Sequence, residues 1–118
     1  MARIILIDDD DLLSSTLAQA LTEAGHTVAV AANGFDGVAL FRKESADLIL
    51  TDITMPHGGL PTIRVLRAEF PKLPIIAMSG NPTHLDVAGA LGASRILPKP
   101  FTLGQLATAI AEVLAIRA

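Results

Sequence analysis

Acidic, hydroxyl and amine side chains follow four of the aliphatic runs in this sequence. They are the acidic run Asp8–Asp11, then Asp52, Ser79 and Lys99. Taken singly, each has a structural explanation, because aspartates cap helices, Ser-Gly is an ordinary turn and a lysine between prolines is typical of a solvated loop. Taken together, they are the residue types of a phosphoryl-transfer site. That chemistry requires separate strands to bring them to one place.

Three of the carboxylates, those of Asp8, Asp9 and Asp52, are expected to lie close together. Such a group repels itself unless a cation shares the site. Oxygen ligands without His or Cys are typical of Mg²⁺, or of Mn²⁺. A carboxylate is also a possible nucleophile, which would form an acyl phosphate. Lys99 would then supply a mobile positive charge, and Ser79 a hydroxyl donor, for the phosphoryl oxygens.

Five aliphatic runs predict strands, and most are continuous, which is typical of strands covered on both faces. The runs are Ile4–Ile7, Thr27–Ala31, Asp47–Thr51, Pro74–Met78 and Arg95–Leu97. Stretches with helical spacing follow each of them, marked by Leu13–Leu21, Val38–Phe41, Ile63–Phe70, Pro82–Leu91 and Leu103–Leu114. This alternation predicts an α/β fold with a parallel sheet and helices on both faces. Ligands of such sheets bind beyond the carboxyl ends of the strands, where the four chemical groups stand.

Capping residues mark several helix ends. Pro82 and Gly92 bound the fourth helix, because proline suits a first turn and glycine the position after the last. Thr102–Gln105 has the pattern of a capping box, and Leu103 is assigned to the apolar stripe of the last helix. Asp10-Asp11 is assigned to helix capping rather than to chemistry.

Length and composition limit the class of protein. The 118 residues are expected to form a single domain, 1–118, with no output domain after the last helix. A net charge of −3 and 3% aromatic residues argue against direct binding of nucleic acid. The chain has no cysteine, no signal-peptide core and no apolar run long enough for a membrane span. We therefore expect a cytoplasmic protein with no membrane partner.

Four motifs closely resemble the response-regulator receiver family, the CheY-like signalling domains of two-component systems. They are Ile5–Asp10, Leu48–Pro56, Ile76–Gly80 and Leu97–Phe101. The resemblance covers the whole chain and is closest to receivers that stand alone. It implies a flavodoxin-like, doubly wound sheet of five parallel strands in the order 2-1-3-4-5, with five helices on its two faces.

The resemblance also assigns roles at the site. It implies that Asp52 is the phosphoacceptor and that Asp8 and Asp9 hold the metal together with Asp52 and the backbone carbonyl of Thr54. Ser79 takes the place of the switch hydroxyl and Lys99 that of the phosphate-sensing lysine. The Lys99–Pro100 peptide bond is expected to be cis.

One position departs from the family pattern. The residue three before the lysine is often an aromatic that rotates between buried and exposed positions, and here it is Ile96. Any output must therefore use the backbone and other side chains. The interpretation assigns Val87, Ile96, Gln105 and Leu106 to the face that changes its affinity for a partner.

The expected function is that of a phosphoprotein regulator. A histidine kinase or histidine phosphotransferase would pass its phosphoryl group to Asp52, and the change of shape would alter binding to an unidentified downstream protein. The domain would promote its own phosphorylation and dephosphorylation without acting on a separate substrate.

Three other readings compete with this one. A pseudo-receiver would keep the fold as a phosphorylation-independent interaction module. A phosphatase of the haloacid-dehalogenase type needs a further acidic pair after the lysine, where only Glu112 is acidic. A dinucleotide-binding domain lacks its Gly-rich motif after the first strand. The histidines at positions 26, 57 and 84 lack metal-ligand spacing.

Overall fold

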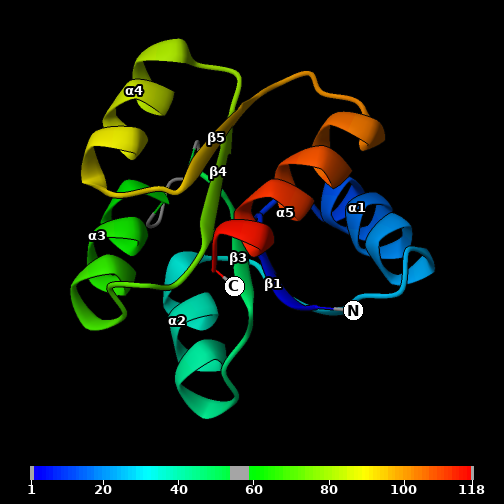
Figure 1. Cartoon of the computed structure of the whole chain (residues 1–118), viewed down its shortest axis with the longest axis horizontal. Coiled ribbons are helices and arrows are strands. Elements are labelled where there is room, and N and C mark those ends of the chain that lie inside the picture. Colours follow the sequence, from blue (N-terminus) through cyan, green and yellow to red (C-terminus); the bar gives the residue numbers. More distant parts are fainter. Residues whose placement is uncertain (1, 54–58, 118) are drawn as a thin grey trace.

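The computed structural model describes residues 2–53 and 59–117, with the side chains of all but the last two of these. Within these residues, five strands alternate with five helices (Figure 1). The strands are β1 (Arg3–Ile7), β2 (Thr27–Ala31), β3 (Leu48–Asp52), β4 (Ile75–Ser79) and β5 (Arg95–Pro98). The helices are α1 (Asp11–Glu23), α2 (Gly34–Lys43), α3 (Gly59–Glu69), α4 (Pro82–Leu91) and α5 (Leu103–Arg117). None of the described helices is long and apolar enough to cross a membrane.

All five strands are parallel and lie in the order β2-β1-β3-β4-β5, which confirms the predicted sheet. The three inner strands are almost wholly buried, whereas β2 and β5 at the edges are partly exposed. This difference explains why the inner strands are the most aliphatic, since both of their faces are covered.

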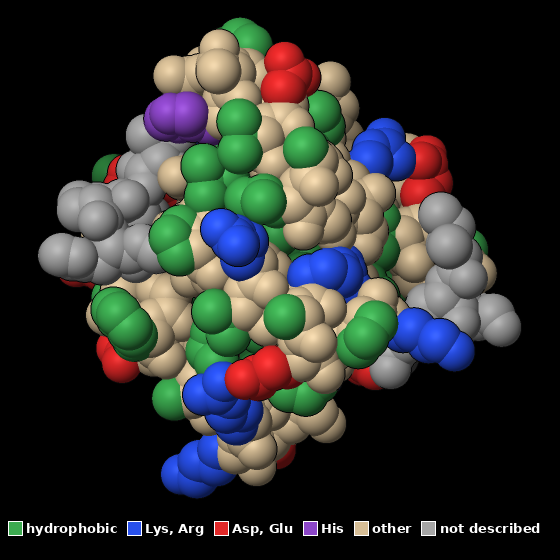
Figure 2. Space-filling view, turned by 90° about the vertical axis from the view of Figure 1, so that its left-hand side faces the viewer, with side chains coloured by type: hydrophobic (Ala, Val, Ile, Leu, Met, Phe, Trp, Pro, Cys, Tyr) green, Lys and Arg blue, Asp and Glu red, His purple; other side chains and the backbone are tan. Residues whose placement is uncertain are grey.

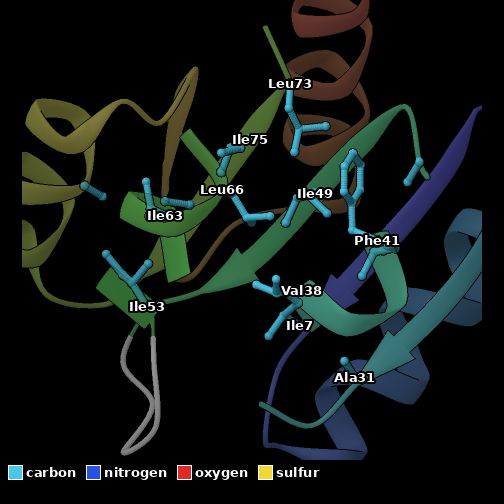
Figure 3. Close-up of a cluster of buried hydrophobic side chains, with 14 of the residues drawn as sticks. Ile7, Ala31, Val38, Phe41, Ile49, Ile53, Ile63, Leu66, Leu73 and Ile75 are labelled. Atoms are coloured by element: carbon cyan, nitrogen blue, oxygen red, sulfur yellow. The ribbon is translucent and has the colours of Figure 1, made fainter. Parts of the chain in front are cut away.

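Two apolar layers lie on opposite faces of the sheet (Figure 1). Helices α2, α3 and α4 cover one face, and Figure 3 shows Val38, Phe41, Ile63 and Leu66 meeting side chains of the strands there. Helices α1 and α5 cover the other face with residues such as Leu17 and Ile110. The helices thereby fix the sheet from both sides and hold its carboxyl edge in place.

The predicted helix ends agree closely with the structure. Helix α4 runs from Pro82 to Leu91, and Gly92 follows it with a φ of 113° in the left-handed region. Thr102 and Gln105 exchange two hydrogen bonds at the start of α5, of 2.8 and 3.0 Å, which confirms the capping box. The assignment of Leu103 to the apolar stripe was wrong, because its side chain is 55% exposed in the first turn of α5.

Gly59 is required where α3 begins close to the end of β3. A Cβ atom at this position would lie 2.4 Å from the Cα and 2.5 Å from the carbonyl oxygen of Ile53. Because backbone atoms cannot rotate away, Gly59→Ala is expected to lower the free energy of unfolding by about 2 kcal/mol in urea denaturation. Gly89→Ala is the matched control, since a Cβ atom there would have no atom of another described residue within 4 Å apart from its own helix backbone and chain neighbours. It should raise stability by about 0.5–1 kcal/mol, and equal effects of the two changes would contradict the steric account.

Candidate functional site

The parallel register brings the predicted site residues to one edge of the sheet. Asp52 is the last residue of β3 and pairs with Met78, while Ser79 is the last residue of β4 and pairs with Pro98. Asp8 follows β1 directly, and its N–H donates to the carbonyl oxygen of Ala31 at 3.0 Å. The side chains thus come from four strands that end at nearly the same level.

Carboxylate oxygens of Asp8, Asp9 and Asp52 all lie within 4.8 Å of one another. Asp8 is 1% exposed and Asp52 is 6% exposed, whereas Asp9 is open to solvent. Such a cluster carries strong mutual repulsion, because two of its members are shielded from water. The open side at Asp9 gives a cation a route to the two buried carboxylates.

The two carboxylate oxygens of Asp8 differ in their hydrogen bonding to the described residues. Its Oδ1 accepts from the backbone N–H of Asp10 at 2.9 Å. Its Oδ2 is buried and has no hydrogen-bond partner among the residues that the structure describes. A buried carboxylate oxygen without a partner is energetically costly, and it fits a group that a cation completes.

The electrostatics of Asp8 show the same need for positive charge. Burial raises the pKa of this carboxyl above its ordinary value, and the hydrogen bond from Asp10 opposes the rise. The charge of Asp52 raises the pKa further, while the nearby ammonium of Lys99 lowers it. Neutral or metal-bound, Asp8 is better accommodated in this site than as a bare anion.

Lys99 makes the direct ion pair of the site. Its Nζ lies 2.9 Å from Oδ2 of Asp52, and the two side chains are 25% and 8% exposed. The Lys99 N–H donates to the carbonyl oxygen of Ser79 at 2.9 Å, and the Lys99–Pro100 peptide bond is cis, as the resemblance implies. The lysine is therefore held by the backbone next to β4 while its ammonium reaches across to β3.

Ser79 links the sheet edge to the start of α4. Its side chain is fully buried, and its Oγ accepts from the backbone N–H of Asn81 at 3.0 Å. The side chain of Asn81 in turn accepts from the N–H of His84 and caps α4. Sequence reasoning missed this role of Asn81, although Asn before a proline at a helix start is a recognisable capping signal.

Other expectations at the site have mixed outcomes. Thr54 and His57 lie outside the described residues. Asp10 caps α1 by accepting from Leu13 at 3.1 Å, as predicted. His26 accepts from the N–H of Ala2 at 3.0 Å, away from the carboxylates.

Glu112 pairs with Arg95 and does not belong to the carboxylate cluster found among the described residues. It therefore does not supply the further acid that a phosphatase of the haloacid-dehalogenase type would need.

The proposed partner face needs one correction. Val87 and Gln105 are exposed, and Ile96 is partly buried against the α2–α3–α4 layer. Leu106 is only 1% exposed and packs with α1 and the sheet, so it cannot contact a partner directly. Helical spacing alone did not separate these positions, because α5 is apolar over much of its surface.

The donor set fits Mg²⁺ or Mn²⁺. All three side chains offer only carboxylate oxygens, one of which is the buried Oδ2 of Asp8 that lacks a partner among the described residues. Hard divalent ions prefer such ligands and keep waters in their remaining positions.

We expect Asp8→Asn to stabilise the metal-free protein at neutral pH. The pKa of Asp8 is higher in the folded state than in the unfolded state. The contribution of this carboxyl to the free energy of unfolding is therefore fully present below about pH 3.9, the ordinary aspartate value, and is lost as pH rises through the higher folded pKa. Asparagine does not titrate, so the advantage of the variant should appear across this window and persist at pH 7. Urea denaturation in EDTA from pH 3 to 8 measures it.

Asp86→Asn is the control for this experiment, because Asp86 is an exposed carboxylate on α4 outside the cluster. Adding Mg²⁺ should reverse the order, stabilising the native chain more than Asp8→Asn. A variant that is less stable than the native chain at every pH would contradict the electrostatic account.

Comparison with known proteins gives one family. The model of the response regulator receiver domain matches residues 4–111. Curated relatives include CpxR of Escherichia coli K12, 38% identical over 117 residues, and AfsQ1 of Streptomyces coelicolor, 38% identical over 103 residues, both transcriptional regulatory proteins. The matches cover 97% and 85% of this chain, and 50% and 45% of those proteins. The chain thus spans about half the length of these relatives.

Solved structures agree with the sequence relatives. A receiver domain protein of Clostridium thermocellum superposes with a TM-score of 0.92 at 26% identity, covering 99% of this chain and 97% of that one. The chemotaxis protein CheY4 of Vibrio cholerae has a TM-score of 0.88 at 27% identity, with coverage of 96% and 98%. With nearly its whole length matched by the family model, the chain belongs to the response regulator receiver domain family.

Proposed function

We propose that Asp52 accepts a phosphoryl group from a phosphohistidine and that the resulting acyl phosphate changes the binding of a partner protein. The observation that carries the proposal is the double environment of Asp52. This buried strand-end carboxylate lies in the cluster with Asp8 and Asp9, and it also contacts the ammonium of Lys99. A nucleophile flanked by a cation site and a fixed positive charge has what phosphoryl transfer requires.

In the proposed step, a carboxylate oxygen of Asp52 attacks the phosphorus of the donor in line with its phosphorus–nitrogen bond. That bond breaks and the imidazole nitrogen leaves with the electron pair. The donor reacts with a proton on its other ring nitrogen, so the histidine leaves as neutral imidazole. A bound Mg²⁺ would supply positive charge for the phosphoryl oxygens. Lys99, whose ammonium contacts the same carboxylate, adds a second positive charge, and hydrolysis by water would later regenerate Asp52.

Ser79 and Lys99 are the proposed sensors of the phosphoryl group. Both are tied to elements beyond the site, because Ser79 is hydrogen-bonded to the start of α4 and Lys99 directly follows the last residue of β5. New contacts with phosphoryl oxygens would therefore bias the position of these elements, because a ligand shifts a conformational equilibrium only through contacts that differ between the states. The altered face would then change its affinity for a downstream protein.

The proposed donor is a histidine kinase or histidine phosphotransferase, and the proposed location is the cytoplasm. The support is membership of the receiver family, whose transcriptional regulators include the relatives named above. The identities of the kinase and of the downstream protein are not specified by the site.

Intact-mass spectrometry tests the proposal. The protein is incubated with phosphoramidate or acetyl phosphate in Mg²⁺, beside a sample in EDTA. We expect a single phosphoryl adduct in Mg²⁺ and none in EDTA. If no adduct forms and a beryllofluoride titration also leaves the site unperturbed, the proposal fails in favour of a phosphorylation-independent interaction module.

A further inference from the structure

Arg67, in the last turn of α3, joins three parts of the chain. Its Nε donates to the carbonyl oxygen of Gly92 at 2.9 Å. Its Nη1 donates to the carbonyl oxygens of Phe70 and Pro71 at 3.1 and 2.8 Å, and its Nη2 approaches Oγ of Ser94 at 3.4 Å. The side chain is partly buried, and a guanidinium so placed is held by several fixed acceptors rather than by one ion pair.

Two of the residues that Arg67 contacts, Gly92 and Ser94, lie in the connection from α4 to β5. Gly92 ends α4 with a φ of 113°, and a Cβ atom at that position would lie 2.8 Å from Cγ of Arg67. Ser94 is bound to β4 as well, because its N–H donates to the carbonyl oxygen of Ile75 at 2.8 Å and its Oγ accepts from the N–H of Ile75 at 3.1 Å. The C-terminal end of α4 is therefore fixed to both α3 and β4.

The N-terminal end of α4 has a different environment. No atom of a described residue lies within 4 Å of the Cβ position of Gly80, so these residues do not enclose the backbone there. The connection to the sheet passes through the hydrogen bond from the Asn81 N–H to Oγ of Ser79, beside the carboxylate site. One end of α4 is thus held by a guanidinium, while the other end depends on a hydroxyl that the proposed function assigns to phosphoryl binding.

We propose that Arg67 is a positioning residue that anchors the C-terminal end of α4, so that occupancy of the Asp52 site moves residues 80–88 about a fixed end at 92–94. This inference rests on the proposed function for the stimulus, but the anchor itself belongs to the resting structure. The anchor also explains how a signal could leave the site although Ile96 stands where other receivers have a rotating aromatic. When a helix turns about one fixed end, its backbone displaces the other end, and no rotating side chain is needed.

The side of the molecule that carries α3 and α4 in Figure 1 is turned toward the viewer in Figure 2. Hydrophobic side chains are interspersed there with Lys and Arg side chains rather than gathered into one patch. Arg64 lies on the same helix as Arg67, one turn earlier, and is exposed. Arg64→Met is a matched control, since it makes the same substitution on the same helix and leaves the contacts of Arg67 with Gly92 and Ser94 in place.

The test follows amide chemical shifts in the native chain, Arg67→Met and Arg64→Met, each with and without Mg²⁺ and beryllofluoride. In the native chain and in Arg64→Met, shifts are expected in residues 80–88 and not in 92–94. In Arg67→Met the shifts should spread through 92–94 while the affinity for beryllofluoride stays the same. A role in stability alone would lower the melting temperature and leave this pattern unchanged, which would overturn the inference.

Hydrogen exchange of the ligand-free protein separates the anchor from the proposed function. The amides of Ala93 and Ser94 are hydrogen-bonded at 3.0 and 2.8 Å, so their exchange rates report on the anchor. Arg67→Met should raise these rates at least about tenfold, because several hydrogen bonds to a charged group are lost, and Arg64→Met should not. If beryllofluoride has no effect on the native chain and no phosphoryl adduct forms, the proposed function fails, and unchanged exchange rates would overturn the anchor independently.

A second variant guards against loss of folding in Arg67→Met. Ser94→Ala removes only the Oγ that contacts Nη2 of Arg67 and the N–H of Ile75. It is expected to give a smaller rise in exchange at 93–94 and a partial spread of the shifts. Native-like behaviour of this variant in both measurements would count against the anchor.

Discussion

Replacing Asp52 with asparagine is expected to slow formation of the phosphoryl adduct by at least about 10³-fold, because the substitution removes the carboxylate that attacks phosphorus. An amide oxygen is a much weaker nucleophile than a carboxylate. The substitution keeps the size of the side chain and leaves Asp8 and Asp9 in place. Intact-mass spectrometry after incubation with phosphoramidate and Mg²⁺ measures the effect.

Asp11→Asn is the control for the Asp52 variant. Asp11 is an exposed acid in the first turn of α1, close to the same edge of the sheet but outside the carboxylate cluster. The control should form the adduct at nearly the native rate. An adduct on Asp52→Asn at a rate within tenfold of native would show that another side chain accepts the phosphoryl group.

Lys99→Met is expected to lower the free energy of unfolding of the metal-free protein by about 3 kcal/mol. Asp52 is 6% exposed and would lose its ammonium partner at 2.9 Å, which leaves a buried charge beside Asp8. Mg²⁺ should restore a large part of the loss, because it supplies positive charge to the same carboxylates. Urea denaturation in EDTA and in Mg²⁺ gives both values.

Lys72→Met serves as the matched substitution for Lys99→Met, since Lys72 is an exposed lysine in the connection between α3 and β4. Its effect should stay within about 0.5 kcal/mol in either solution. A loss for Lys99→Met that is as small, or that Mg²⁺ does not reduce, would mean that the ion pair contributes little to holding Asp52.

The fold was largely predictable because its signals are local. The continuous aliphatic runs gave the inner strands, and Pro82 with Gly92 bounded α4 to the residue. The chemical groups were found because parallel strands carry their functional residues at the carboxyl ends. The strand order came from the family resemblance rather than from these local patterns.

Side-chain exposure and long-range contacts were less predictable. Leu103 and Leu106 both fit the helical stripe of α5, yet one is 55% exposed and the other 1% exposed. Arg67 was overlooked because the acceptors that join it to the end of α4, the carbonyl of Gly92 and the hydroxyl of Ser94, lie 25 and 27 positions away in the chain, and no sequence pattern marks such contacts. That Oδ2 of Asp8 is buried and has no hydrogen-bond partner among the described residues likewise could not be predicted from the sequence.

The most direct test of the central claim is to locate the phosphoryl group. An acyl phosphate is reduced by borohydride to the alcohol with loss of phosphate, which converts a phosphorylated aspartate into homoserine. Peptide mass spectrometry of protein treated with phosphoramidate, Mg²⁺ and borohydride should find homoserine at position 52, and none there without the donor. Homoserine at Asp8 or Asp9 instead, or an adduct that leaves Asp52 unreduced, would contradict the assignment of Asp52 as the phosphoacceptor.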